Sequence, residues 1–224
     1  PICLKKYDLI MDEEITIINE KTRNEKIKIF FLNNKKLFLT SILIIILLIL
    51  SFYIFQIYKD NQKEQISNKY NNSIIEYNIN DKTKTALSMK EIVENKDSTY
   101  SPLALYFIID NKLIENKNEI KELFDILIYK TSLDAEIKNL IIYKKGLFYS
   151  DTKKESELLN ILNPLINSNS IWKSHALYLI AEYFYSKNEK QKAKEFFNQI
   201  LSTPNANQDI ISEAQKRLIR DLSE

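Results

Sequence analysis

The longest hydrophobic run in the chain covers residues 37–57, LFLTSILIIILLILSFYIFQI, and contains no charged residue. At 1.5 Å per residue, a helix of this length is about 30 Å long, which matches the hydrocarbon core of a bilayer. A buried helix of a soluble domain would show a polar stripe at this length, and this run shows none. The pattern therefore predicts a single transmembrane helix over residues 37–57.

Helical periodicity continues after this run. Residues 58–80 lack proline and glycine, and Tyr70, Ile74 and Tyr77 form an apolar stripe, so we expect a helical stalk there. Further helices are predicted over residues 83–94, 103–113, 120–129, 135–149, 157–166, 172–185, 191–201 and 208–222. Ser101 precedes Pro102, which favours a helix that starts there with Ser101 as its N-cap. The predicted fold class is all-α, with one transmembrane helix, a helical stalk and antiparallel helical hairpins.

The hairpin of residues 172–201 carries the clearest repeat pattern. Its predicted packing positions are Leu177, Ile180, Ala181 and Phe184 on the first helix, and Ala193, Phe197, Ile200 and Leu201 on the second. Small residues twelve apart, at Ala181 and Ala193, with an aromatic four residues later, show the spacing of tetratricopeptide (TPR) repeats. Two antiparallel helices approach closely only where small residues face each other. We therefore expect a TPR-like hairpin solenoid.

The preceding hairpin fits this spacing less well. Thirty-five residues earlier, Gly146, Leu158 and Leu162 occupy the corresponding places. Lys145 falls in a slot that should be apolar, and Pro164 is expected to interrupt the second helix. This repeat is therefore degenerate, and its register is open by a residue or more.

Basic residues around the apolar run predict its orientation. The twenty residues before it contain Lys21, Arg23, Lys26, Lys28, Lys35 and Lys36, whereas the twenty after it contain Lys59, Lys63 and Lys69. This bias predicts a cytoplasmic N-terminus and an exported C-terminal part. A cleaved signal peptide would have a shorter apolar region followed by small residues, so we expect an uncleaved anchor. Four regions result: a cytoplasmic segment (1–36), the transmembrane helix (37–57), the stalk (58–80) and the exported TPR-like domain (81–224).

The cytoplasmic segment leaves two questions open. Residues 12–34 are charged with interspersed apolar positions, which is typical of an amphipathic stretch at the membrane surface or of a loosely ordered tail. The chain begins at Pro1, and Met11 is a plausible true start.

Composition excludes several classes of function. Lys and Arg number 32 and Asp and Glu 30, a balance that gives no electrostatic footprint for nucleic acid. The one cysteine, Cys3, precedes the anchor, so an exported disulfide scaffold or thiolate metal site is excluded. A single glycine argues against phosphate-binding loops and nucleophile elbows. We expect no enzyme activity, no cofactor and no small-molecule substrate.

His175 and Trp172 are expected to have structural roles and no catalytic role. His175 is the only histidine, and a catalytic triad or His-based metal site would need partners that are absent, so we expect it on a helix surface. Trp172 is expected to pack at the start of its helix.

One helix face is a candidate binding surface. Tyr178, Glu182 and Tyr185 recur at i, i+4 and i+7 opposite the apolar stripe, where TPR hairpins line their concave groove. Exposed aromatic side chains there could hold an extended or helical peptide, and Tyr143 and Leu147 would extend the surface. The alternative is that these residues pack on the preceding hairpin.

The order of these parts resembles a known family. The segments DEE and EKTRNEKIKIFF, the anchor, and the stretches NPLINSNSIWKSHALYLIAEYFY, AKEFFNQILSTP and AQKRL resemble the YfgM-like ancillary subunit of the bacterial Sec translocon, in its alphaproteobacterial form. The resemblance covers residue 12 to the C-terminus. It implies a bitopic inner-membrane protein without catalytic residues, whose periplasmic domain contacts the translocon and periplasmic folding factors. The poor middle repeat leaves other membrane-anchored TPR proteins open.

Two other functions also stay open. One is a membrane-tethered, chaperone-like binder of unfolded chains, and the other is a scaffold for cell-envelope assembly or division. TPR folds bind many kinds of partner, so the sequence does not separate these functions from the adaptor.

Overall fold

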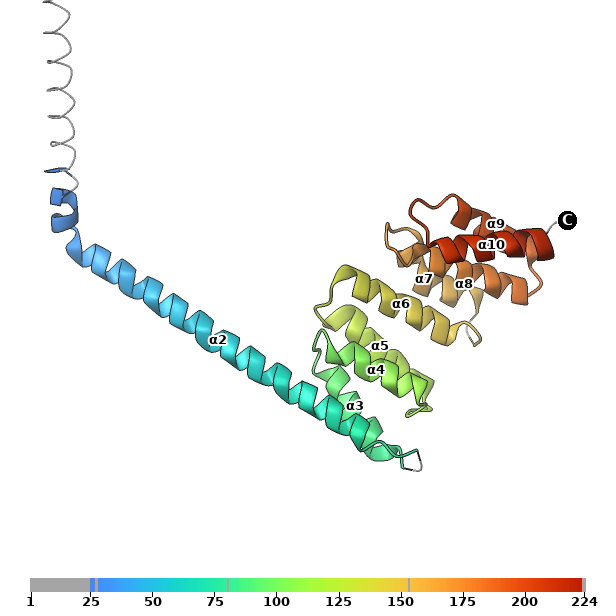
Figure 1. Cartoon of the computed structure of the whole chain (residues 1–224), viewed down its shortest axis with the longest axis horizontal. Helices are drawn as coiled ribbons and strands as arrows, with labels where there is room; N and C mark the ends of the chain where they lie inside the picture. The colour runs from blue at the N-terminus through green and yellow to red at the C-terminus, as the bar shows by residue number, and fades with distance from the viewer. Residues whose placement is uncertain (1–24, 27, 80, 153, 223–224) are drawn as a thin grey trace, which may run out of the picture. The chain divides into compact units, whose positions relative to one another are not determined.

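The computed structural model describes residues 25–26, 28–79, 81–152 and 154–222 (Figure 1). Within these ranges the chain is helical, and its one β-type contact is an isolated bridge between Asn78 and Asp81. The all-α prediction is therefore confirmed for the described part. The predictions for Met11, Cys3 and residues 12–24 lie outside the described residues. The chain forms two compact units, residues 1–62 and 63–224.

The apolar run lies in the first unit, within helix α2 (Lys35–Ile75), which continues into the second unit. Its most apolar 18-residue window has a mean hydropathy of 2.9, and none of that window is buried. The hydroxyl groups of Thr40 and Ser41 both donate to the carbonyl of Leu37, at 2.9 Å. These polar side chains are thus satisfied within the helix. The helix is long and apolar enough to cross a membrane.

A turn at Asn34 precedes α2. The Asn34 amide donates to the carbonyl of Phe30 at 2.9 Å, and residues 28–33 before it are helical. The rings of Phe31 and Phe38 lie 4.4 Å apart across this turn. The side chains of Phe30 and Phe31 are about half exposed.

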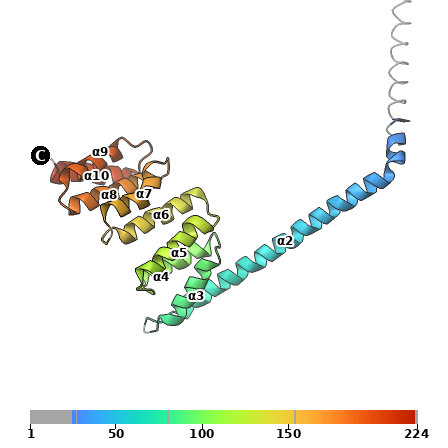
Figure 2. The ribbon, with the colours of Figure 1, turned by 180° about the vertical axis from the view of Figure 1, so that it is seen from behind.

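The described residues of the second unit form the end of α2 and eight shorter helices. They are α3 (Thr83–Glu94), α4 (Tyr100–Asp110), α5 (Lys117–Lys130), α6 (Ala135–Tyr149), α7 (Glu155–Ile166), α8 (Lys173–Ser186), α9 (Lys190–Leu201) and α10 (Gln208–Asp221). The pairs α3–α4, α6–α7 and α8–α9 are antiparallel hairpins, while α5 packs on α3, α4 and α6 (Figures 1 and 2). Helix α8 contacts α6, and α10 contacts both α8 and α9. Phe124, Phe184 and Phe197 are the largest fully buried side chains of the core.

The predicted stalk differs from the observed structure. Helix α2 ends at Ile75, and its part from Lys63 onward belongs to the second unit. Tyr70 packs against Tyr100 with ring centroids 5.6 Å apart, whereas Ile74 is 38% exposed. Tyr77 lies beyond the helix end and contacts Phe107 edge-on at 5.4 Å. The predicted stripe is therefore broken, because only its first member faces the helical domain from within α2.

The start of α4 also differs from the prediction. The Asp97 carboxylate accepts hydrogen bonds from the backbone N–H groups of Thr99 (2.9 Å) and Tyr100 (2.7 Å), which satisfies free donors at the helix start. Ser101 is not the N-cap: it is buried, and its hydroxyl donates to the carbonyl of Ile92 at 2.6 Å. The predicted cap was wrong because Asp97 supplies the acceptor four residues earlier.

Pro164 does not interrupt α7, contrary to the prediction. The helix continues through it and ends at Ile166. Proline has no backbone N–H, so the carbonyl of Asn160 lacks the hydrogen bond that residue 164 would otherwise donate. Asn160 and Pro164 are both exposed, so water can bind that carbonyl. The proline therefore falls on the solvent side in the last turn, where its cost is small.

Gly146 allows α6 and α7 to approach closely. A Cβ atom at this position would lie 2.5 Å from Cδ2 and 2.9 Å from Cγ of Leu162, which is fully buried. The repeat spacing predicted a small residue here, but the three atoms nearest to the added Cβ all belong to Leu162, which corresponds to Phe197, and not to Leu158, which corresponds to Ala193. The turns, by contrast, use other residue types. Lys96, Lys112 and Asn188 follow helix ends and Asn205 lies in the loop between α9 and α10, and all four adopt left-handed backbone angles with φ between 49° and 61°.

Candidate protein-interaction site

The predicted packing positions of the last hairpin lie in the core with one exception. Leu177, Ile180, Ala181, Phe184, Ala193, Phe197 and Ile200 are all at most 1% exposed. Leu201 is 41% exposed, so its predicted packing role was wrong. It is the last residue of α9 and lies one residue beyond Ile200, which turns it about 100° away from the buried stripe.

The face of α8 that was predicted to line a groove is covered by α10. The Arg217 guanidinium of α10 donates to the Glu182 carboxylate at 2.6 Å and lies 5.0 Å from the ring centroid of Tyr185. The Tyr178 ring contacts Phe197 edge-on at 5.5 Å. Arg217 also donates to Asp221 at 2.8 Å. Glu182 and Tyr185 therefore pack against α10, whereas Tyr178 packs against α9.

Tyr143 and Leu147 do not extend that face into one groove. Tyr143 stacks on Trp172 with centroids 5.9 Å apart and planes at 19°, and His175 packs edge-on against Tyr143 at 5.7 Å. Leu147 is 45% exposed. Trp172 thus packs at the start of α8 as predicted, whereas His175 is half-buried and not a solvated surface residue. Burial lowers the pKa of His175.

Lys145 explains the apparent misfit of the middle repeat. This buried lysine donates to the Asp125 carboxylate at 2.6 Å, and the Tyr149 hydroxyl donates to the carbonyl of Lys117 at 2.6 Å. Burial raises the pKa of Asp125, but hydrogen bonds from Lys145 and Lys121 outweigh it and hold that pKa below its ordinary value. The polar pair joins α5 to α6 across the slot that the repeat pattern assigned to an apolar side chain.

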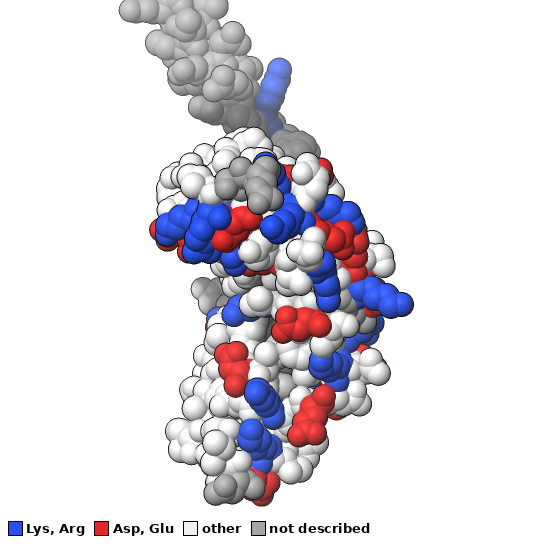
Figure 3. Space-filling model, turned by 90° about the vertical axis from the view of Figure 1, so that its right-hand side faces the viewer, with Lys and Arg blue, Asp and Glu red and all other residues white. Residues whose placement is uncertain are grey.

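Charged residues give no concentrated site in the described part of the chain. Basic and acidic side chains are interspersed over the face shown in Figure 3. Among the described residues, no group of three or more His, Cys, Asp or Glu side chains is placed to hold a metal ion.

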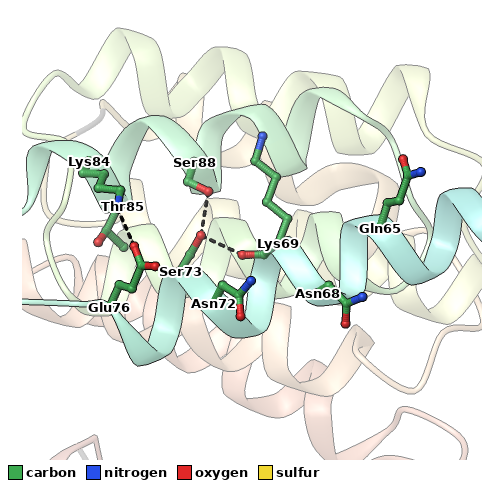
Figure 4. A pocket seen from close by; sticks show the side chains of 9 residues that line it. All are labelled: Gln65, Asn68, Lys69, Asn72, Ser73, Glu76, Lys84, Thr85 and Ser88. Carbon is green, nitrogen blue, oxygen red and sulfur yellow. Dashed lines mark hydrogen bonds and ion pairs between the residues drawn. The ribbon is translucent and has the colours of Figure 1, made fainter.

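An open polar groove lies between the end of α2 and α3 (Figure 4). Its volume is about 500 Å³. The lining residues are Gln65, Asn68, Lys69, Asn72 and Ser73 from α2, Glu76 from the turn directly after it, and Lys84, Thr85 and Ser88 from α3. The hydroxyls of Ser73 and Ser88 meet at 2.6 Å, and Ser73 also donates to the carbonyl of Lys69 at 2.8 Å. Paired hydroxyls thus connect the two helices at the floor of the groove.

The lysines and amides of the groove differ in their partners. Lys84 pairs with Glu76 at 2.5 Å, and Lys69 pairs with Glu91. Gln65, Asn68 and Asn72 are exposed, and their side chains make no hydrogen bond within the described residues (Figure 4). The groove therefore has nearly balanced charge and three amides whose donors and acceptors are available.

Sequence reasoning missed this groove because polar residues along a helix resemble an ordinary solvated face. The signal that could have found it is the spacing of Gln65, Asn68 and Asn72, which places three amides on one side of α2.

Comparison of the chain with protein-family models, curated proteins and solved structures finds no match. The functional argument therefore depends on two features of the molecule itself. These are the exposed apolar helix and the polar groove in the helical domain that follows it.

Proposed function

We propose that this chain is a non-enzymatic, membrane-anchored protein-interaction adaptor of the bacterial inner membrane. The observation that carries the proposal is the apolar run of α2, whose side chains from Leu37 to Ile57 are almost all exposed. Apolar surface of this extent would drive association in water, and a bilayer covers it without leaving a backbone group unpaired. Residues 37–57 then form the transmembrane segment, with the N-terminus in the cytoplasm and the helical domain in the periplasm.

The helical domain supports a role in binding other proteins. Its hairpins α6–α7 and α8–α9 are joined by contacts between their first helices, and Ala181 and Ala193 are fully buried. Such packing is consistent with a TPR-like solenoid, whose stacked helical pairs present extended binding surfaces. The resemblance to the translocon subunit supports the Sec translocon and periplasmic folding factors as partners.

Topology provides the first test. A reporter that works only after export, fused at the C-terminus, should be active, because six basic residues precede the apolar run and three follow it. A matched fusion to a reporter that works only in the cytoplasm should be inactive. Activity of the cytoplasmic reporter alone would contradict the proposed orientation.

The partners provide the second test. Crosslinking in native membranes followed by purification of the full chain should recover Sec subunits if the adaptor function is right. Recovery of only cell-wall or division proteins would replace the adaptor with an envelope scaffold. A chain that copurifies with no membrane or periplasmic protein would contradict both functions.

A further inference from the structure

The α2–α3 groove carries an inference about what the domain binds. We propose that this groove holds an extended polypeptide segment of a partner protein by hydrogen bonds to its backbone. The inference rests on the proposed adaptor function, and it assigns that function a site and a ligand chemistry.

The three amides of the groove match the groups of an extended backbone. Each amide side chain offers both a carbonyl acceptor and N–H donors, and a peptide backbone alternates the same two groups. Gln65, Asn68 and Asn72 lie on one side of α2, and their side chains make no hydrogen bond within the described part of the chain. From Gln65 to Asn72 the helix rises about 10.5 Å, which is about three residues of an extended strand. The row of amides is therefore long enough to follow a short extended segment.

The lining of the groove argues against a helical peptide. Amphipathic helices dock through apolar side chains that enter an apolar groove. The nine lining residues are Gln, Asn, Lys, Ser, Glu and Thr, without an aliphatic or aromatic side chain among them. A polar lining of this kind favours a ligand that presents hydrogen-bonding groups, which an extended chain does along its whole length.

The charges and rings around the groove argue against nucleic acid and glycans. Lys69 and Lys84 are both paired with carboxylates, so the described residues that line the groove offer no free cation to a phosphate backbone. The nearest ring of α2, Tyr70, packs on Tyr100 and does not line the groove. No ring is thus available to stack on a sugar. Balanced charge also predicts that the bound segment carries little net charge.

Binding should be measured with the full chain in nanodiscs. The probe is a library of random-sequence dodecapeptides, and enriched peptides are resynthesised with a fluorescent label for titration. We expect Gln65→Ala, Asn68→Ala and Asn72→Ala, combined in one variant, to raise Kd at least about tenfold, because several hydrogen bonds are lost. Alanine favours helix over asparagine and glutamine, so α2 should stay folded in this variant. Circular dichroism checks that expectation.

Two controls make the test specific. Asn71 is exposed on α2 but does not line the groove, so Asn71→Ala should leave Kd unchanged. N-methylation of alternate backbone nitrogens in an enriched peptide removes N–H donors and keeps the side chains. The methylated peptide should bind at least about tenfold more weakly if the backbone is recognised.

Several outcomes would overturn the inference. They are failure to enrich any peptide, equal affinity of the wild type and the triple variant, and equal affinity for the methylated peptide. Copurification of the same partners from membranes that contain the triple variant would also remove the groove from partner binding. That last result leaves the adaptor function standing, whereas the absence of any partner with the wild type would reject the function itself.

Discussion

Helices α6 and α7 approach closely at Gly146. We therefore expect Gly146→Ala to lower Tm when Leu162 is present and to raise Tm when Leu162 is replaced by alanine. A Cβ atom at Gly146 would lie 2.5 Å from a terminal methyl of Leu162 and 2.9 Å from its Cγ. Because the second contact involves a branch point of a fully buried side chain, rotation of the leucine alone cannot relieve both contacts. Accommodating the methyl group therefore requires a movement of α6 or α7.

Two opposing effects decide the result of Gly146→Ala. Replacing glycine by alanine inside a helix gains about 1 kcal/mol in helix propensity. Overpacking a core position costs about 1–3 kcal/mol. The net effect in the wild-type background is then a loss of about 1 kcal/mol, which lowers Tm by roughly 2–4 °C for a domain of this size.

Truncation of Leu162 to alanine should reverse the effect of Gly146→Ala on Tm. Leu162→Ala alone should destabilise the fold by about 2–5 kcal/mol, because it removes buried contacts and leaves a cavity. In that background the methyl group of Gly146→Ala has space, and only the propensity gain of about 1 kcal/mol remains. The same substitution should then raise Tm by roughly 2–4 °C.

Thermal unfolding of the full chain, followed by circular dichroism in one detergent, measures all four variants. Asn160→Ala is a matched control, because Asn160 is an exposed residue of α7. It should raise Tm slightly in both backgrounds through helix propensity alone. If Gly146→Ala shifts Tm in the same direction in the wild-type and in the Leu162→Ala background, the close approach of the two helices is wrong.

The side-chain pairs of the second unit allow three further predictions. Arg217→Ala should increase hydrogen exchange in α10 and leave α3–α7 unchanged, because Arg217 joins α10 to α8; unchanged exchange in α10 would mean that other contacts hold it. Asp125→Ala should cost about 3 kcal/mol in chemical unfolding by leaving Lys145 buried and unpaired, while Asp125→Leu combined with Lys145→Met should cost much less. Equal losses in the two variants would refute a buried, paired lysine. The pKa of His175 lies below its ordinary 6.5, so its stabilising effect is complete above pH 6.5 and is lost as the pH falls through the folded value. His175→Gln should therefore flatten the dependence of Tm on pH below 6.5, and an identical pH profile in this variant would exclude that role.

Helix type and core membership followed from the sequence, because both depend on local periodicity. Helices α3 and α6 have the predicted bounds, and the alanines at positions 181 and 193 are buried as the repeat spacing required. The start of α4 was missed because Asp97 accepts from the backbone there, whereas the Ser101 hydroxyl donates to the distant carbonyl of Ile92. Leu201 was misplaced because the predicted stripe included two adjacent residues, Ile200 and Leu201, which point about 100° apart on a helix.

The binding surfaces were harder to predict, because they depend on contacts between distant residues. The face of α8 looks open in the sequence, and it is covered because Arg217 reaches Glu182 from a helix 35 residues away. In the same way, the polar groove depends on Ser73 and Ser88, whose pairing joins α2 to α3 and leaves the amides beside it accessible. Neither contact leaves a periodic pattern in the sequence.

The left-handed turns described above bear on how this protein can evolve. Lysine or asparagine stands at four turn positions where glycine would relieve steric strain, and the one glycine of the chain lies inside α6. Backbone hydrogen bonds, such as that from Glu189 N–H to the carbonyl of Phe184, keep the turn geometry in the absence of glycine. The fold can therefore tolerate a mutational bias that removes glycine from its turns. Replacing these four residues by glycine offers a stability reserve that the present sequence does not use.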